Sequence, residues 1–315
     1  MNADAHGEGF RILRSDHTLL PLELLWRWSF GLGLLALLFF AYAHLRQAVL
    51  LTDADVEAFS GQDPLAIATA GARVITEAQP LLLRTFTQVA AVAAVLWVAA
   101  STLGRGMLTR MIVRRLAVDY DLKIAPDAPR WSGFAILQMA RVLMLLILAI
   151  GYLAGVLIVA RVNSPGQNLL TDTLVIFAAI AASAVLWSYV NWVLSLAPIF
   201  VARDGLSPLD SIVAALAFIR RNCSRLMAVS IWNSTLRGLA ATVIAAAGAA
   251  TVSMRPALPG WAITTLLALE TLLYPVVSDV FLLVRLAAYS SVAVRELTLS
   301  QALPEPPNHS GTIVG

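Results

Sequence analysis

Polar side chains recur at helical spacing inside three of the most apolar stretches of this 315-residue chain. Side chains three or four residues apart lie on one face of a helix, so each set forms a stripe. A charged group inside an apolar segment is costly, and it therefore points towards a partner, water or a cargo. The stripes are Ser188, Asn191 and Ser195; Ser230, Asn233 and Arg237; and Glu270, Tyr274 and Ser278, with Asp279 beside the last.

Counting residues along the stretches predicts that Arg237 and Glu270 meet. Arg237 lies about 11 residues from one end of its stretch and Glu270 about 14 residues from the same end of the next, a difference of roughly 5 Å at 1.5 Å per residue. Asp279 lies about 8 Å nearer that end, and Pro275 can kink the helix so that both acids share a side. The sequence therefore predicts one polar cluster, made of Asn191, Asn233, Arg237, Glu270, Tyr274 and Asp279.

Two kinds of role fit such a cluster. It can line a cavity that handles a proton, an ion or an amphiphilic substrate. Alternatively, one arginine neutralised by two carboxylates, with Asn and Ser as hydrogen-bonding neighbours, locks helices together. A single base among two acids, without a histidine, favours the lock, and replacing Arg237 by alanine should then reduce the amount of folded protein. Arg141 borders its own apolar run, where we expect its side chain to reach the lipid headgroups.

Sequence signatures of catalysis and metal binding are absent. No two histidines stand at i, i+4 as an H-E-x-x-H helix requires, and neither a G-x-S-x-G motif nor a glycine-rich phosphate loop ahead of a lysine occurs. The single cysteine, Cys223, excludes a disulfide within the chain. Asp53, Asp55 and Glu57 resemble an acidic metal loop but lack its glycine and final glutamate, so we interpret them as acids that start a short helix. We predict no enzyme, no metal site and no cofactor.

The elements that carry these residues are predicted to be membrane-spanning helices. Hydrophobic residues make up 59% of the chain, the mean hydropathy is +0.79, and charged residues make up only 13%, about half the share in a soluble domain. The stretch from Leu174 to Ala202 has no charged side chain and exceeds the ~20 residues that cross a bilayer. The fold class is therefore an all-α, polytopic transmembrane helical bundle with interfacial amphipathic helices. Six spans are expected, near 21–43, 85–104, 133–160, 174–202, 226–254 and 261–284.

The distribution of basic residues predicts the orientation of the spans. Fifteen lie on one predicted side of the membrane: before or within the first turns of span one, between spans two and three, between spans four and five, and after span six. Only five lie in the segments on the opposite side, which connect spans one and two, three and four, and five and six. Segments rich in arginine and lysine stay in the cytoplasm, so both termini are expected inside. The abundance of alanine and the preference for arginine over lysine, of which Lys123 is the only one, indicate a bacterial inner membrane protein.

The chain is expected to divide into three regions. A cytoplasmic N-terminal segment covers residues 1–20, the membrane domain covers 21–297, and a disordered tail covers 298–315. In the membrane domain, an external loop spans about 45–83 and contains a helix that begins at Pro64 and ends near Pro80. The larger cytoplasmic loops span about 105–130 and 203–225.

The second of these cytoplasmic loops carries the signature of a helix. Ser207, Pro208 and Asp210 provide a cap, a first-turn proline and an acid at the third position, and Arg220 and Arg221 close the segment. We interpret it as an amphipathic helix at the cytoplasmic interface. Its predicted apolar face consists of Leu209, Ile212, Val213, Leu216 and Ile219.

The same segment carries a resemblance to a known family. It reads Pro198-Ile199-Phe200-Val201, then Asp204-Gly205-Leu206-Ser207-Pro208-Leu209-Asp210, then Ala214 and Ile219-Arg220. This resembles a bacterial pattern in which a span ends at a proline, an acidic-Gly turn follows, and an amphipathic helix leads into the next hairpin. It is similar to the membrane domain attached to some glycerophosphoryl-diester phosphodiesterases and to related six-span inner-membrane families. The chain lacks their soluble catalytic barrel and its metal-binding acids, so the resemblance implies a six-helix membrane protein without that hydrolytic activity.

Together these features predict a non-enzymatic scaffold or accessory subunit of the bacterial cell envelope. The alternative is a transporter or permease component for an ion or small molecule, which uses the polar cluster between spans four, five and six. A lipid-active enzyme is a third reading, and it would need polar groups clustered at headgroup depth. Expected partners are the lipid bilayer and membrane or cytoplasmic proteins. A net charge of only +3 argues against nucleic acid as a partner.

Overall fold

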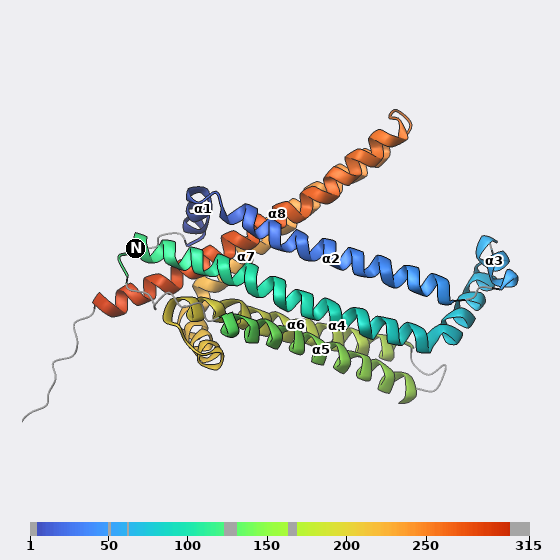
Figure 1. Cartoon of the computed structure of the whole chain (residues 1–315), viewed down its shortest axis with the longest axis horizontal. Coiled ribbons are helices and arrows are strands. Elements are labelled where there is room, and N and C mark those ends of the chain that lie inside the picture. Colours follow the sequence, from blue (N-terminus) through green and yellow to red (C-terminus); the bar gives the residue numbers. More distant parts are fainter. Residues whose placement is uncertain (1–4, 50–51, 62, 123–130, 163–168, 303–315) are drawn as a thin grey trace, which may run out of the picture. The chain divides into compact units, whose positions relative to one another are not determined.

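A computed structural model describes residues 5–49, 52–61, 63–122, 131–162 and 169–302, and every regular element in these ranges is an α-helix (Figure 1). This confirms the predicted all-α fold. The helices are α1 (Ala5–Ser15), α2 (Leu19–Ala48), α3 (Asp53–Ser60), α4 (Pro64–Asp119), α5 (Trp131–Val162), α6 (Leu169–Asp204), α7 (Pro208–Ser253) and α8 (Gly260–Ala302).

Six of these helices, α2 and α4 to α8, are long and apolar enough to cross a membrane. Each has an 18-residue window with a mean hydropathy between 1.4 and 2.2, as expected for a segment that faces hydrocarbon. The six predicted spans are therefore confirmed.

Two helices continue through points where the sequence predicts an end. α4 passes through Pro80 and continues over 105–119, so the whole of the predicted external helix and much of the predicted cytoplasmic loop belong to one helix. α8 passes through Pro275 and reaches Ala302, and the predicted tail beyond Ala302 lies outside the described residues. A proline removes one backbone hydrogen bond and can bend a helix, but the bonds of the neighbouring turns remain.

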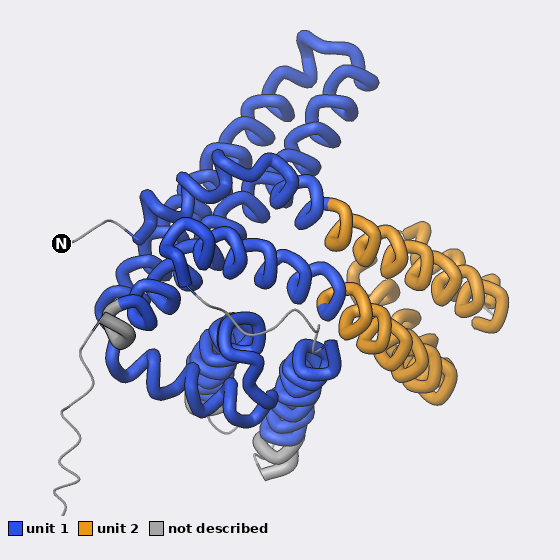
Figure 2. Tube along the Cα trace, turned by 60° about the vertical axis from the view of Figure 1, so that its left-hand side comes forward, with its two compact units in different colours: residues 1–24, 102–315 blue, residues 25–101 orange. Residues whose placement is uncertain are grey.

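The chain forms two compact units, shown in different colours in Figure 2. The smaller one, Leu25–Ser101, holds most of α2, all of α3 and the N-terminal part of α4. Within it, Trp97 of α4 packs edge-on against Trp26 and Phe30 of α2, with ring centroids 5.9 and 5.0 Å apart. These aromatic contacts join the two spans of this unit.

The short helix α3 is capped at its start and tied to α4. The Thr52 hydroxyl accepts a hydrogen bond from the Asp55 amide, and the Asp55 carboxylate accepts one from the Thr52 amide at 2.9 Å. Arg73 of α4 donates to the Asp55 carboxylate and, at 3.0 Å, to Thr52 Oγ1. Arg73 first, and Thr52 second, lower the pKa of Asp55 to about 2. The predicted acidic start of a short helix is therefore confirmed.

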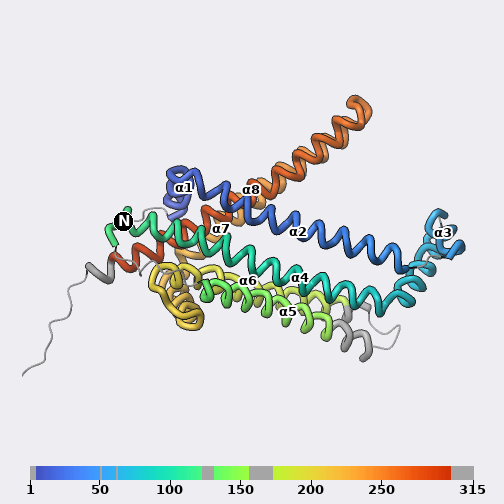
Figure 3. Tube along the Cα trace, viewed as in Figure 1, coloured from blue at the N-terminus to red at the C-terminus, as the bar shows by residue number. Residues whose placement is uncertain are grey.

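The larger unit consists of Met1–Leu24 and Thr102–Gly315. In it α1 packs on α8, and α5 to α8 pack as successive neighbours, with α7 and α8 forming a hairpin (Figure 3). Its buried core contains residues of α4, α5, α6, α7 and α8, among them Val113, Phe134, Leu196, Phe218 and Tyr289. We call the region around this core the basic end, and it comprises α1, 19–24, 102–122, 131–141, 193–233 and 282–298.

The α7–α8 hairpin beyond the basic end presents apolar side chains outward. Val243 of α7 is 61% exposed and Trp261 of α8 is 74% exposed. In water such a surface would be unfavourable, whereas in a bilayer it faces lipid tails.

The corner between α6 and α7 forms as the sequence predicts. Gly205 has a φ of 65°, in the left-handed region that favours glycine. The Ser207 hydroxyl accepts a hydrogen bond from the Asp210 amide at 3.3 Å, and Pro208 occupies the first turn of α7. α7 bends at Asn222, where φ is −118° and ψ is 22°, so the predicted amphipathic helix is its first segment.

The buried face of this segment differs from the predicted one. Ser211, Ala215 and Phe218 are fully buried, whereas Leu209 and Val213 are 76% and 65% exposed. The small side chains at 211 and 215 let α7 approach the core closely, where Phe218 packs edge-on against Phe200 at 5.5 Å between centroids. Of the predicted apolar face, Leu209 and Val213 therefore point outward, whereas Ile219 is buried and Ile212 and Leu216 pack against the core.

Candidate functional site

The structure does not gather the six residues of the predicted cluster into one site. Glu270 of α8 accepts a hydrogen bond from Thr251 Oγ1 of α7 at 2.7 Å. Gly248 leaves room for the carboxylate, because a Cβ there would lie 3.1 Å from Glu270 Oε2. Arg237 lies 14 residues before Thr251 on α7, which is about 21 Å along the helix. The predicted pairing of Arg237 with Glu270 is therefore wrong.

The direction in which side chains lean explains this result. In an α-helix every Cα–Cβ bond tilts towards the helix N-terminus. Because α7 and α8 form an antiparallel hairpin, Arg237 leans towards the basic end and Glu270 leans towards the α7–α8 turn. Arg237 is half-buried, and no hydrogen bond or ion pair joins it to another described residue. From that position a long arginine side chain can reach the headgroups.

Asn233 contacts the N-terminal helix instead of α8. It is 4% exposed, and its Nδ2 lies 2.9 Å from the Val229 carbonyl and 3.2 Å from His6 Nδ1. The His6 ring also meets Trp232 edge-on, with centroids 5.7 Å apart. Asn233 therefore fastens α1 to α7 at the basic end.

The cluster residues on α7 and α8 consequently lie at separate levels. Asn233 is 18 residues from Thr251, the partner of Glu270, or about 27 Å, which is close to the ~30 Å thickness of the hydrocarbon core. Asp279 is 4% exposed and lies nine residues from Glu270, about 14 Å nearer the basic end. Tyr274, between the two acids, is 37% exposed.

Asn191 belongs to a different group of polar residues, which surrounds Arg141. The Arg141 guanidinium is buried and donates to Gln138 Oε1 and to Ser195 Oγ, both at 3.2 Å. Ser195 Oγ in turn donates to the Asn191 carbonyl at 2.6 Å. The prediction that Arg141 extends to the headgroups is wrong, because its side chain is buried and donates hydrogen bonds to acceptors on α5 and α6.

Charged side chains from α1, α4 and α8 interlock at the basic end. The Glu8 carboxylate pairs with Arg11 at 2.5 Å and with Arg295 of α8 at 3.5 Å. Arg11 also reaches Asp119 at the end of α4 at 3.2 Å, and Arg295 Nε donates to Tyr120 Oη at 2.8 Å. The hydrogen bond from Arg11 is the main reason that the pKa of Glu8 is lowered. The carboxylate is therefore charged and holds three segments together.

The same end of α8 is joined to the α6–α7 corner. Glu296 forms an ion pair with Arg221, with Nε 2.8 Å from a carboxylate oxygen, and accepts a hydrogen bond from Asn222 Nδ2 at 3.2 Å. Arg203 donates to the Ala293 carbonyl at 2.6 Å. We call both sets together the terminal clasp, and it consists of Glu8, Arg11, Asp119, Tyr120, Arg203, Arg221, Asn222, Arg295 and Glu296.

Sequence reasoning misses the terminal clasp. Its partners are far apart in the chain, and charged residues beside a span are ordinarily read as solvated loop residues. One available signal was the spacing of Glu8 and Arg11, one turn apart and followed by the apolar Ile12, which is typical of an amphipathic helix. Ile12 is 1% exposed, so this face does pack against the protein.

No protein-family model, curated protein sequence or solved structure matches the chain. In the described ranges, no group of three or more His, Cys, Asp or Glu side chains could hold a metal ion. The class of the molecule therefore follows from its fold, which is that of a multi-pass α-helical integral membrane protein.

Proposed function

We propose that this protein is a non-enzymatic scaffold or accessory subunit of the bacterial inner membrane, with both termini in the cytoplasm. The terminal clasp is the observation that carries the proposal. It joins α1, the end of α4, the α6–α7 corner and α8, and it uses their charged groups to hold one arrangement. A rigid cytoplasmic surface of this kind suits the binding of a partner.

A relationship to six-span inner-membrane families is part of this proposal. These families include the membrane domain attached to some glycerophosphoryl-diester phosphodiesterases. The α6–α7 corner supports it, because Gly205 makes the turn and Ser207 and Pro208 start the following helix, as the shared pattern requires. The excess of arginine at this end supports its cytoplasmic location.

Transport through the polar cluster is the weaker proposal. Asn233 and Glu270 lie near opposite ends of the α7–α8 hairpin, and each contacts a different neighbour, His6 and Thr251. An ion or proton path needs polar groups that succeed one another at short intervals across the membrane. The described side chains of the predicted cluster do not form such a series.

Site-specific photocrosslinking in living cells tests the scaffold proposal. A photoreactive residue in place of Val118, which is 78% exposed at the end of α4, should give one reproducible protein adduct. The same residue in place of Val243, which is 61% exposed on the lipid-facing part of α7, is the matched control and should give none. The adduct should disappear when Arg295→Gln opens the terminal clasp.

Ion transport by the purified protein would be the contrary outcome. Proteoliposomes of the wild-type protein could pass protons or small ions, with Glu270→Gln abolishing the flux and the Val118 position giving no protein adduct. That result would establish the transporter and overturn the scaffold.

A further inference from the structure

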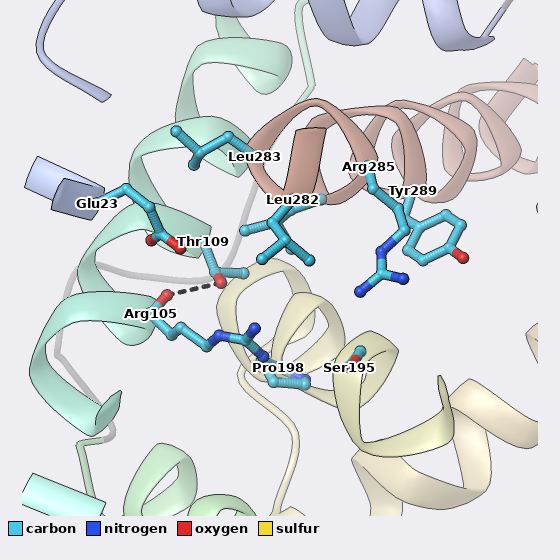
Figure 4. A pocket seen from close by; sticks show the side chains of 10 residues that line it. Glu23, Arg105, Thr109, Ser195, Pro198, Leu282, Leu283, Arg285 and Tyr289 are labelled. Carbon is cyan, nitrogen blue, oxygen red and sulfur yellow. Dashed lines mark hydrogen bonds between the residues drawn. The ribbon is translucent and has the colours of Figure 1, made fainter. Parts of the chain in front are cut away.

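A small cavity lined by both polar and apolar side chains lies at the basic end, within the unit formed by Met1–Leu24 and Thr102–Gly315. Its volume is about 30 Å³, enough for about two water molecules. Side chains from the first turns of α2 and from α4, α6 and α8 line it (Figure 4). The polar ones are Glu23, Arg105, Thr109, Ser195, Arg285 and Tyr289.

The cavity carries an excess of positive charge. Arg105 of α4 and Arg285 of α8 approach the space between the helices from different sides (Figure 4). Among the described residues that line the cavity, Glu23, which is 3% exposed, supplies the one carboxylate. The buried Arg141 contacts the lining residue Ser195, to whose Oγ it donates at 3.2 Å, and adds a further positive charge beside the cavity. Converging positive charges attract an anion, and the planar guanidinium matches the oxygens of a phosphate.

The depth of the cavity matches the headgroup layer. Arg285 lies 25 residues after Gly260, the first residue of α8, or about 38 Å along the helix. The hydrocarbon core is about 30 Å thick and the bilayer with its headgroups about 40–45 Å. A span that enters the core at Gly260 therefore places Arg285 among the phosphates of the leaflet at the basic end. Leu282 and Leu286, one turn apart on α8, line the cavity beside it and suit the apolar part of a lipid.

We propose that this cavity binds a phosphate group, with the guanidinium groups of Arg105 and Arg285 pairing with its oxygens. Only the non-bridging oxygens need to enter a space of about 30 Å³. The group belongs either to a membrane phospholipid or to free phosphate. The site does not depend on the proposed scaffold role, because no residue of the terminal clasp takes part in it.

Thermal unfolding of the full-length protein in detergent tests this assignment. Phosphatidylglycerol and inorganic phosphate are titrated separately, with sodium chloride at equal ionic strength as the reference. A saturable rise in Tm with phosphatidylglycerol alone assigns the site to a lipid, and an equal rise with inorganic phosphate assigns it to the free anion. If neither phosphatidylglycerol nor inorganic phosphate raises the Tm above its value in sodium chloride, the proposal is overturned.

Variants with opposite expected effects make the test specific. Arg285→Gln should weaken the binding of the stabilising anion about tenfold, because it removes a charge-assisted pair. Glu23→Gln should strengthen binding several-fold, because it removes the opposing carboxylate. Arg220→Gln, at an exposed position on α7, should leave binding unchanged. Equal affinities in all variants, or weaker binding by Glu23→Gln, would contradict the assignment even if Arg285→Gln does not fold.

Discussion

Arg141 and Arg237 both lie in apolar helices, yet their surroundings differ. Arg141 is 6% exposed and has acceptors on Gln138, one turn earlier in α5, and on Ser195 of α6. Arg237 is half-buried and has no such partner among the described residues. Burying a guanidinium is costly unless acceptors are close, and Arg141 donates to two of them inside the bundle, so we expect it to contribute to the fold. We expect the long side chain of Arg237 to extend to the membrane surface instead.

The two arginines should respond differently to the same substitution. Arg141→Ala removes buried charge-assisted hydrogen bonds and should lower the free energy of unfolding by roughly 2 kcal/mol or more. Arg237→Ala should change it by no more than about 0.5 kcal/mol. Both values follow from denaturant titration of purified protein in detergent. A larger loss of unfolding free energy in Arg237→Ala than in Arg141→Ala would instead support the interhelical lock that the sequence predicts.

Asp55 gives a prediction about pH, because Arg73 lowers its pKa to about 2. An unfolded aspartate titrates near ~3.9, so the ion pair stabilises the folded form fully above about pH 4. That contribution is lost as the pH falls through the folded pKa, towards pH 2. The carboxyl carbon signal of Asp55 should therefore titrate well below that of an ordinary aspartate.

The variant Arg73→Gln is the matched control for this titration. Without the guanidinium, the midpoint for Asp55 should return towards ~3.9, and amide exchange in α3 should become faster. A wild-type midpoint that already lies near the ordinary value would show that the ion pair does not form in solution.

At the scale of elements, a single glycine decides how α1 meets α8. A Cβ at Gly9 would lie 2.5 Å from the carbonyl oxygen of Val284, closer than real Cβ atoms approach. The glycine therefore permits the two backbones to touch, with Ile12 buried one turn later. The charges of the terminal clasp then act on helices that are already in contact.

Gly9→Ala should separate α1 from α8. The added methyl group meets backbone that cannot rotate away, so the free energy of unfolding should fall by about 1–3 kcal/mol. The same change at Gly151 of α5, where no atom lies within 4 Å, should be neutral or stabilising by up to about 1 kcal/mol. Thermal unfolding of both variants measures the contrast, and equal Tm shifts would mean that α1 is not docked as described.

The number and type of the elements could be predicted from the sequence, but their ends could not. Long charge-free stretches such as Leu174 to Ala202 identify spans because hydrocarbon leaves the backbone no alternative to helix. Hydropathy has no corresponding signal for a helix that continues into water, so the extension of α4 to Asp119 is missed. The start of α7 was predictable because Ser207 and Pro208 act locally.

The candidate site was less predictable, for a physical reason. The sequence identifies Asn233, Glu270 and Asp279 as polar residues in apolar helices, and they are all at least partly buried. The contacts that these residues make depend on the register of the hairpin and on the direction in which each side chain leans. The spacing of polar residues along one helix determines neither of these. The partner of Glu270 is Thr251, an uncharged residue near the turn that no charge-pairing argument selects.

Within the larger unit, which holds four of the six spans and part of α4, charge and packing concentrate at the same end. The buried core of the larger unit, the terminal clasp and most of the arginines belong to the basic end, whereas the far part of the α7–α8 hairpin exposes apolar side chains. This asymmetry is expected of a membrane protein whose water-facing segments organise on one side. We propose that the six spans place this basic end in the cytoplasm.

The labelling of Cys223, the single cysteine, tests that claim most directly. It is exposed at the basic end, so a membrane-impermeant maleimide should react with it in inverted membrane vesicles and not in right-side-out vesicles. In a Cys223→Ser background, Ala257→Cys in the exposed α7–α8 turn should show the opposite pattern. Labelling of both positions from the same side, or of Cys223 only from the outside, would contradict the account.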